Sequence, residues 1–207
     1  MGDIVYVMTN EAMPGIIKIG YTDNIENRIK TLDRTSLPLP FECHYAARVA
    51  NAFEIERILH TLFAEQRIRP NREFFRLSPE KVVTALRLTP HQDVTPRIGI
   101  FEDAEEQRAV TETRARRDRI NLRAINVPVG AELVFSRDTD IKCTVLNETQ
   151  IDYQGTVTSL SRSALNILQA KGYSIGSVSG SVFWMYEGET LDERRQRIES
   201  EQFESAP

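Results

Sequence analysis

Two cations lie close to apolar positions near the start of the chain. Lys18 stands in the apolar run "GIIKIGYT", and Arg28 borders a helical stripe formed by Ile25, Ile29 and Leu32. Each is open to two interpretations: a solvated side chain near the edge of a core, or part of a pocket that holds a polyanion. An arginine beside an apolar stripe can simply extend its head to water. Which of the two interpretations applies depends on the polar residues nearby.

A tyrosine precedes the lysine in a segment that predicts a β-hairpin. "DIVYVMTN" and "IIKIGYT" are rich in β-forming residues, and the turn between them contains Pro14 and Gly15. Residues directly opposite on two paired strands face the same side of the sheet. If the side-chain parity matches, Tyr6 and Lys18 therefore lie on one face.

A histidine and two glutamates follow further along the chain. Glu56 and His60 are four residues apart and share one flank of a helix predicted from Phe53 to Gln66. Glu73 comes just before two phenylalanines, which would anchor it. The plain alternatives are a hydrogen-bonded structural histidine and a surface ion pair between Glu73 and Arg72.

The elements around these residues predict a small α+β unit. Strands are expected at 3–10, 16–22 and 41–49, with a short extended segment at 72–77. Asp23 and Glu26 resemble a capping box that begins the first helix. Ser78 at the N-cap and a proline after it begin a closing helix.

The remainder divides into a linker, a charged helix and a second domain. We expect a first domain at 1–89, a linker and helical spacer at 90–125, a small α+β domain at 126–190 and a charged tail at 191–207. The second domain contains three predicted strands, a helix ending at Gly172 and a final strand over "SVFWMYEG". The tail predicts a short helix followed by disorder.

Composition narrows the class of protein. The chain has 207 residues, 41% of them hydrophobic, and no apolar run approaching the roughly 20 residues of a membrane span. It shows no secretory leader, and Cys43 and Cys143 fit neither a disulfide framework nor a zinc site. A soluble cytoplasmic protein without a membrane partner is expected. The net charge of −4 does not exclude DNA binding, because most of the excess acid follows Trp184.

The order Tyr, x-Ile-Gly, Arg, His, Glu resembles that of GIY-YIG nucleases. "VYV" resembles the GIY element and "KIG" the YIG element, and the likeness to the phage-encoded branch extends over residues 3–88 to the ending "NREFF". Ile4 and Val5 replace the first two family letters. Lys18 replaces the tyrosine that most members have, as it does in some restriction enzymes of the superfamily.

This resemblance implies a small mixed or antiparallel three-stranded sheet flanked by helices, and it implies a chemistry. Glu73 would bind one Mg²⁺ (or Mn²⁺). Tyr6 would orient or deprotonate the attacking water with help from Lys18, and Arg28 would stabilise charge on phosphorus. His60 would be a second acid or base or a phosphate contact.

The second domain resembles the restriction-and-methylase-associated type, which reads DNA, including modified DNA. Trp184 and Tyr153, with nearby aromatics, would form a stacking wall for an extruded base. Ser161 and Arg162 would contact phosphates at a helix N-terminus, and Arg72 of the first domain would contact DNA. The alternatives are that the aromatic residues form a core and that a serine is an ordinary N-cap.

Both halves together predict a metal-dependent DNA endonuclease, used as a modification-dependent restriction enzyme. The charged spacer would allow a homodimer, which would supply the two cuts of a duplex break. Two alternatives stay open: a catalytically silent nucleic-acid sensor, and a nuclease of repair or of mobile elements.

Overall fold

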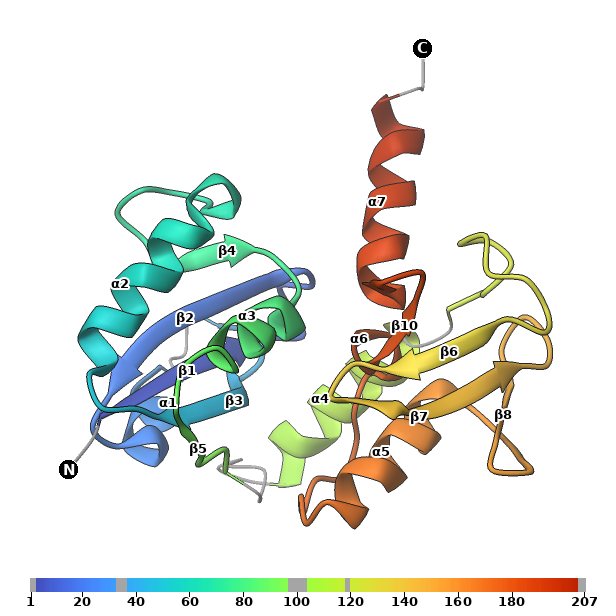
Figure 1. Ribbon diagram of the computed structural model, residues 1–207, viewed down its shortest axis with the longest axis horizontal. Coiled ribbons are helices and arrows are strands. Elements are labelled where there is room, and N and C mark those ends of the chain that lie inside the picture. Colours follow the sequence, from blue (N-terminus) through green and yellow to red (C-terminus); the bar gives the residue numbers. More distant parts are fainter. Residues whose placement is uncertain (1–2, 33–36, 97–103, 118–119, 205–207) are drawn as a thin grey trace. The chain divides into compact units, whose positions relative to one another are not determined.

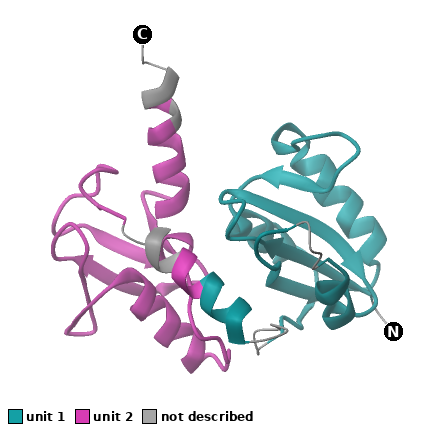
Figure 2. Cartoon of the chain, turned by 180° about the vertical axis from the view of Figure 1, so that it is seen from behind, with its two compact units in different colours: residues 1–110 teal, residues 111–207 magenta. Residues whose placement is uncertain are grey.

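The chain forms two compact units. The computed structural model describes residues 3–32, 37–96, 104–117 and 120–204, and its units comprise residues 1–110 and 111–207 (Figures 1 and 2). The boundary falls inside helix α4 (Ala104–Arg117), within the predicted spacer. Residues 97–103 of the predicted linker and spacer lie outside the described residues. Within the described ranges, no helix combines the length and apolar composition that a membrane crossing requires.

The first unit is built on an antiparallel sheet of five strands in the order β4-β2-β1-β3-β5. This confirms the α+β class, although the sheet is larger than the expected three strands, because the segments around Phe74 and Gln92 also pair. The strands are β1 (Ile4–Thr9), β2 (Ile16–Thr22), β3 (Glu42–Arg48), β4 (Phe74–Arg76) and β5 (Gln92–Asp93). The helices are α1 (Ile25–Leu32), α2 (Ala52–Leu62), the 3-10 turn η1 (Ala64–Gln66) and α3 (Pro79–Leu86).

Strand alternation divides the first unit into two apolar layers. Val5, Val7, Ile17 and Ile19 point to one face and pack with residues of α2 and α3. On the other face, Ile4, Tyr6 and Met8 pack with residues of α1. Because opposite faces of one strand enter different layers, a one-residue change of register would exchange the two cores.

The start of α1 differs from the prediction. Asn24, and not Asp23, caps the helix, since the Asn24 side-chain oxygen accepts a hydrogen bond from the Asn27 backbone N–H at 3.0 Å. Asp23 lies one residue before the cap and is exposed. The expected capping box is therefore wrong, and Asp23 is available for another role.

The second unit also has an antiparallel sheet, with the order β11-β10-β6-β7-β8-β9. Its strands are β6 (Glu132–Phe135), β7 (Asp138–Val145), β8 (Ile151–Tyr153), β9 (Thr156–Thr158), β10 (Trp184–Tyr186) and β11 (Glu189–Thr190). Its helices are α5 (Leu160–Ala170), α6 (Gly180–Phe183) and α7 (Leu191–Glu204).

Three expectations for the second unit need correction. Its core includes Ile120, Leu122 and Ile125, so the packed unit begins before residue 126. The expected final strand over 181–188 is split, because residues 180–183 form the turn of α6 and only 184–186 continue as β10. The charged tail forms a longer and better packed helix than expected, since α7 extends to Glu204 and its Leu191 and Ile198 enter the core. The expected disorder falls on residues 205–207, which lie outside the described residues.

A buried arginine, Arg194, attaches the charged helix α7 to the rest of the second unit. The Arg194 Nε donates to the Ile125 carbonyl at 2.8 Å, and its Nη1 donates to Glu189 at 2.9 Å and Glu187 at 3.1 Å. The guanidinium also lies over the Tyr186 ring. These bonds join α7 to the segment before β6 and to the β10–β11 hairpin, and they satisfy a charge that burial would otherwise penalise.

Trp184 is part of the core and not of an exposed stacking wall. Its exposed fraction is 0%, and its indole N–H lies within hydrogen-bonding distance of the Ser163 hydroxyl (3.1 Å) and the Leu160 carbonyl (3.2 Å). Tyr153 packs edge-on against it. Because no face of Trp184 reaches solvent, the proposed role in stacking an extruded base is wrong for this residue.

Replacing Ser163 by alanine tests this assignment. Ser163→Ala removes one of the two acceptors of the indole N–H, and we expect the free energy of unfolding of the second unit to fall by about 1 kcal/mol. Trp184 is the only tryptophan of the chain, so urea unfolding followed by its fluorescence reports this unit. Ser174→Ala, at an exposed position, is the matched control. Equal, near-zero effects of both substitutions would contradict the buried assignment.

Candidate active site

The position of Tyr6 depends on a glycine on the neighbouring strand. Tyr6 and Gly20 are paired across β1 and β2, and so are Met8 and Lys18. Paired residues share a face, so Tyr6 and Lys18 lie on the same side of the sheet. A Cβ atom at Gly20 would lie 2.5 Å from the Tyr6 hydroxyl oxygen and 2.7 Å from Cζ. The phenol therefore occupies space that only a glycine leaves open.

Arg28 reaches the buried phenol from α1. Its Nε donates a hydrogen bond of 2.9 Å to the Tyr6 hydroxyl, and its guanidinium carbon lies 5.9 Å from the centre of the Tyr6 ring. Among the described residues, its two terminal nitrogens make no hydrogen bond. Arg28 therefore holds the phenol with one N–H and keeps the planar edge that suits two oxygens of a phosphate.

Lys18 pairs with Glu73 across the edge of the sheet. The Lys18 Nζ lies 2.5 Å from the Glu73 Oε2, and the lysine side chain is 8% exposed against 39% for the glutamate. A buried ammonium needs such a partner. The backbone of Glu73 is also fixed, because its carbonyl accepts a hydrogen bond from the Ile19 N–H at 3.1 Å. Lys18 thus orients the carboxylate of Glu73.

These residues surround one open pocket of about 400 Å³. It is lined by Asp3, Tyr6, Tyr21, Thr22, Asp23, Arg28 and Glu73. Tyr6, Arg28 and Glu73 come from β1, α1 and the segment before β4, so three separate elements bring them together. Lys18 reaches the pocket through its ion pair with Glu73.

His60 lies behind this pocket and not in its lining. Its Nε2 is 3.2 Å from the Ile19 carbonyl oxygen and 3.4 Å from a carboxylate oxygen of Glu56, and its ring packs on Phe75. A carbonyl only accepts, so the short contact requires an N–H on Nε2. The geometry favours a positioning role for His60, which ties α2 to β2, over that of a second acid or base.

The electrostatics of Tyr6 differ from the sequence-based expectation. Burial raises the pKa of Tyr6, and the hydrogen bond and charge of Arg28 oppose this, while Glu73 and Glu56 raise the pKa further. The net pKa is raised above the ordinary tyrosine value, so the side chain is a neutral phenol at neutral pH. The cation that favours its phenolate is Arg28, whereas Lys18 is engaged by Glu73.

Burial also raises the pKa of Glu56, a residue of α2 that lies behind the pocket. The charges of His60, Arg67 and Lys18 oppose this rise, and that of Glu73 adds to it. The charge of Glu73 thus raises the pKa of both Glu56 and Tyr6. Shifted pKa values of this kind are common where side chains are arranged for chemistry.

One carboxylate oxygen of Glu73 remains available for a cation. Its Oε2 is bound by Lys18, and its Oε1 makes no hydrogen bond among the described residues. These residues contain no cluster of three or more histidine, cysteine, aspartate or glutamate side chains arranged to hold a metal ion. A hard divalent ion that keeps most of its waters fits this donor set, since it needs only one or two protein carboxylates.

The first unit has a counterpart among protein families. Residues 3–89 match the T5orf172 domain. The match covers less than half of the chain and coincides with the unit that carries the pocket. It indicates a nuclease-type or DNA-binding domain. No curated protein and no solved structure matches the chain.

The segment that matches the T5orf172 domain contains pocket residues to which the sequence analysis gives no role in the site. Asp23 is expected there only as a helix cap, and Asp3, Tyr21 and Thr22 have no predicted role. The position of Tyr21, Thr22 and Asp23 could have been inferred from the end of β2. The chain there connects the strand that carries Lys18 to the helix that carries Arg28, so its residues lie near both side chains.

Arg72, which was predicted to contact DNA, is exposed beside Glu73, and its carbonyl accepts a hydrogen bond from Arg67.

Several residues of the second unit that were predicted to contact DNA instead make contacts within that unit. The Ser161 hydroxyl oxygen accepts a hydrogen bond from the Gly180 N–H at 3.1 Å, so it fastens α6 to the start of α5. Ser159 is the N-cap of α5, bonding the Arg162 N–H. Arg162 itself is exposed, and Tyr153 is half-buried against the core. Of this set, Arg162 is the exposed residue.

Adding a methyl group at Gly20 tests the packing of Tyr6. Gly20→Ala is expected to displace the phenol, to break its bond to Arg28 and to lower the free energy of unfolding by about 1–3 kcal/mol, the usual cost of overpacking. In a Tyr6→Ala background the same change should be close to neutral. The four unfolding free energies, of the unaltered protein, the two single variants and the double variant, form a double-mutant cycle. An equal cost in both backgrounds would show that backbone strain, and not the phenol, is responsible.

Removing Arg28 tests the charge balance at Tyr6. In Arg28→Gln the pKa of Tyr6 should rise further, because the opposing cation is lost. NMR titration of ¹³C-labelled tyrosine, with Tyr6→Phe to assign the signal, measures it. Since the folded pKa exceeds the unfolded value, the stability from neutral Tyr6 is present below about pH 10 and is lost as the pH rises through the folded pKa. A lowered pKa in the variant would contradict this balance.

Proposed function

We propose that the first unit is a metal-dependent DNA endonuclease of the GIY-YIG type, which hydrolyses phosphodiester bonds in the pocket of Tyr6, Arg28 and Glu73. The observation that carries the proposal is their convergence on one pocket of nucleotide size. A phenol, a guanidinium with free N–H groups and a carboxylate with a free oxygen are the groups that such a hydrolysis needs.

Each of the three residues has a role that its contacts support. The two terminal nitrogens of Arg28 would bind non-bridging oxygens of the phosphate and stabilise the charge that builds on them. The Tyr6 oxygen, held by the Arg28 Nε, would orient the attacking water by a hydrogen bond. After the phenol has lost its own proton to solvent, the phenolate would take a proton from the water as the water attacks. Lys18 would keep the Glu73 carboxylate in place.

The charges of the pocket support a divalent ion as the cofactor. Asp3, Asp23 and Glu73 line it together with Arg28, and the charge of Lys18 is shared with Glu73. A phosphate would therefore meet more negative than positive charge. Bound at Glu73, Mg²⁺ (or Mn²⁺) would supply Lewis-acid activation of the phosphate and stabilise the leaving oxygen.

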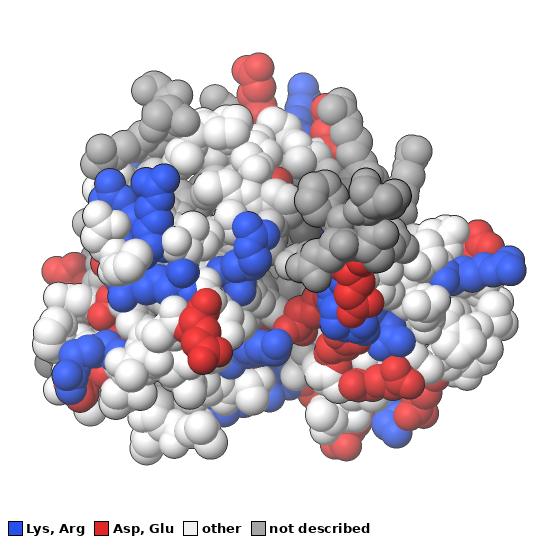
Figure 3. Space-filling model, turned by 90° about the horizontal axis from the view of Figure 1, so that it is seen from above, with Lys and Arg blue, Asp and Glu red and all other residues white. Residues whose placement is uncertain are grey.

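DNA as the substrate is supported by a basic segment near the pocket. Figure 3 shows Lys and Arg side chains gathered over the part of the first unit that faces the viewer. The segment between α2 and β4 carries Arg67, Arg69 and Arg72, and the last two are exposed. Arginines that neutralise backbone phosphates supply affinity without sequence preference.

A modification-dependent restriction role is part of this proposal, although Trp184 no longer supports it as a residue that stacks on a modified base. Trp184 is buried, so the second unit would have to read a modified base with other residues. Arg162 is exposed on α5 and would contact a phosphate. A homodimer through the spacer would supply the second cut of a duplex.

Cleavage by the full-length protein tests the proposed function. Plasmids of plain, methylated and hypermodified DNA are incubated with Mg²⁺ or with EDTA and resolved on gels. We expect Mg²⁺-dependent cutting that falls at least about 100-fold in Tyr6→Phe and in Glu73→Gln. Cutting of modified DNA only would support the restriction role.

The matched control is Glu65→Gln, which removes a carboxylate from an exposed position of η1 in the same unit. It should cut as the unaltered protein does. Glu73→Gln leaves Lys18 without its carboxylate partner, so its thermal unfolding is recorded as well. Tyr6→Phe keeps the ring and gives an independent result. No cutting of any substrate by the unaltered protein would favour a silent nucleic-acid sensor.

A further inference from the structure

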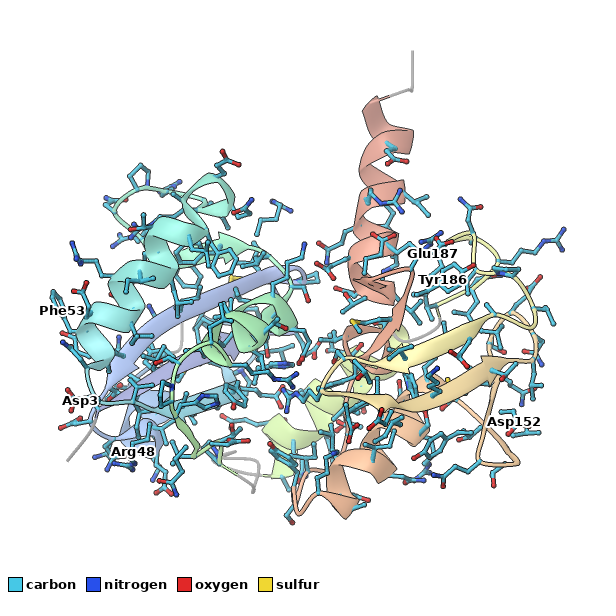
Figure 4. All side chains as sticks on the ribbon, viewed as in Figure 1. Asp3, Arg48, Phe53, Asp152, Tyr186 and Glu187 are labelled. Carbon is cyan, nitrogen blue, oxygen red and sulfur yellow. The ribbon has the colours of Figure 1, made fainter. Side chains whose placement is uncertain are left out.

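Two large aromatic side chains lie exposed at the rim of the pocket. Tyr21, near the end of β2, is 44% exposed and lines the pocket with Tyr6, Arg28 and Glu73. Phe53, in the first turn of α2, is 57% exposed and projects from the edge of the unit (Figure 4). Their ring centres are 5.9 Å apart at an interplanar angle of 79°. The two rings form a pair that faces water.

This pair makes no contribution to either apolar layer of the first unit. The buried positions of α2 are Ala52, Glu56 and Leu59, and Phe53 lies on another side of the helix. Single exposed apolar residues are ordinary on protein surfaces. Here, however, the two rings meet edge to face, an arrangement that aromatic pairs prefer and that leaves both rings partly open to solvent. An exposed aromatic surface therefore borders a polar pocket.

We propose that Tyr21 and Phe53 stack on an unpaired nucleobase adjacent to the phosphate that Arg28 binds. The proposal rests on the proposed function, because it assumes that the pocket takes a phosphodiester. Every nucleobase has a π-face, and stacking on aromatic side chains is the usual way in which proteins hold unpaired bases. The substrate would thus present an unpaired base beside the bound phosphate, as an extruded base of a duplex, a single strand, a flap or a splayed end does.

The dimensions and the chemistry favour this occupant over a paired duplex or a protein. A pocket of about 400 Å³ accommodates one nucleotide and not a duplex. In a duplex both faces of an internal base are covered by its neighbours, so the rings could not reach them. A protein partner would need a broad apolar patch, whereas here the aromatic pair is flanked by the polar lining of Asp3, Thr22 and Asp23.

Binding without cleavage tests the stacking. The full-length protein is titrated in EDTA into a fluorescein-labelled thymidine 12-mer, and fluorescence anisotropy gives Kd. The same measurement uses a 12-mer of abasic nucleotides, which has the same phosphates and no bases. We expect the unaltered protein to bind the thymidine strand roughly 5- to 100-fold more tightly than the abasic strand. In Tyr21→Ala/Phe53→Ala this ratio should fall to near one, with abasic binding unchanged.

The controls separate stacking from folding and from catalysis. Ile58→Ala/Leu62→Ala removes two equally exposed apolar side chains from another part of the α2 surface and should keep the wild-type ratio. Tyr21→Leu/Phe53→Leu keeps apolar side chains of similar bulk but has no aromatic faces, so its ratio of affinities should also fall to near one. This variant shows that the effect does not come from misfolding of the alanine variant. An unchanged ratio in both aromatic variants, or equal binding of both strands by the unaltered protein, would overturn the proposal. The binding assay does not depend on cleavage. If the protein cuts no substrate but the ratio of affinities still falls in the Tyr21 and Phe53 variants, the proposed nuclease activity is refuted and the proposed stacking is not.

Discussion

The site depends on the packing of one phenol against one glycine. Tyr6 is fully buried, and its hydroxyl lies where a side chain at position 20 would stand. This contact is possible only in the register that pairs Tyr6 with Gly20, and the same register places Lys18 opposite Met8. The hairpin thus determines both the position of the phenol and the face on which the lysine lies. Arg28 adds a hydrogen bond from α1, so the first helix is joined to the sheet through the same hydroxyl.

The two cations at the edge of the core solve the same electrostatic problem in different ways. Lys18 is nearly buried and is compensated by a full carboxylate, because an unpaired ammonium in such a place would be costly. Arg28 is half-buried and is held by a neutral hydroxyl, so its charge is not compensated by its hydrogen-bond partner. Consequently Arg28 remains the cation of the pocket that an incoming anion can meet, whereas Lys18 acts through Glu73.

Local patterns predicted the first unit well because its signals are local. Strand runs, the hairpin turn and the apolar stripes of α1 and α2 depend on neighbouring residues, and the α+β class followed from them. The burial of Trp184 and the packing of α7 depend on distant partners: Ser163 lies 21 positions from Trp184, and the Ile125 carbonyl lies 69 positions from Arg194. A charged helix such as α7 shows no apolar stripe, so only its tertiary hydrogen bonds reveal that it is packed. The same limit applies to Tyr21 and Phe53, whose contact joins a strand to a later helix.

The neutral state of Tyr6 gives the pocket its chemical character. A phenol kept protonated by burial, and by the carboxylates of Glu73 and Glu56, is a weak base at rest, yet its conjugate base would be strong. Any positive charge near Glu73 would lower the pKa of Tyr6, because it would cancel a carboxylate that raises it. Proton affinity at the phenol would therefore be coupled through space to the cation proposed at Glu73. This electrostatic link between Glu73 and Tyr6 is the physical reason for proposing one reaction for the phenol and the carboxylate.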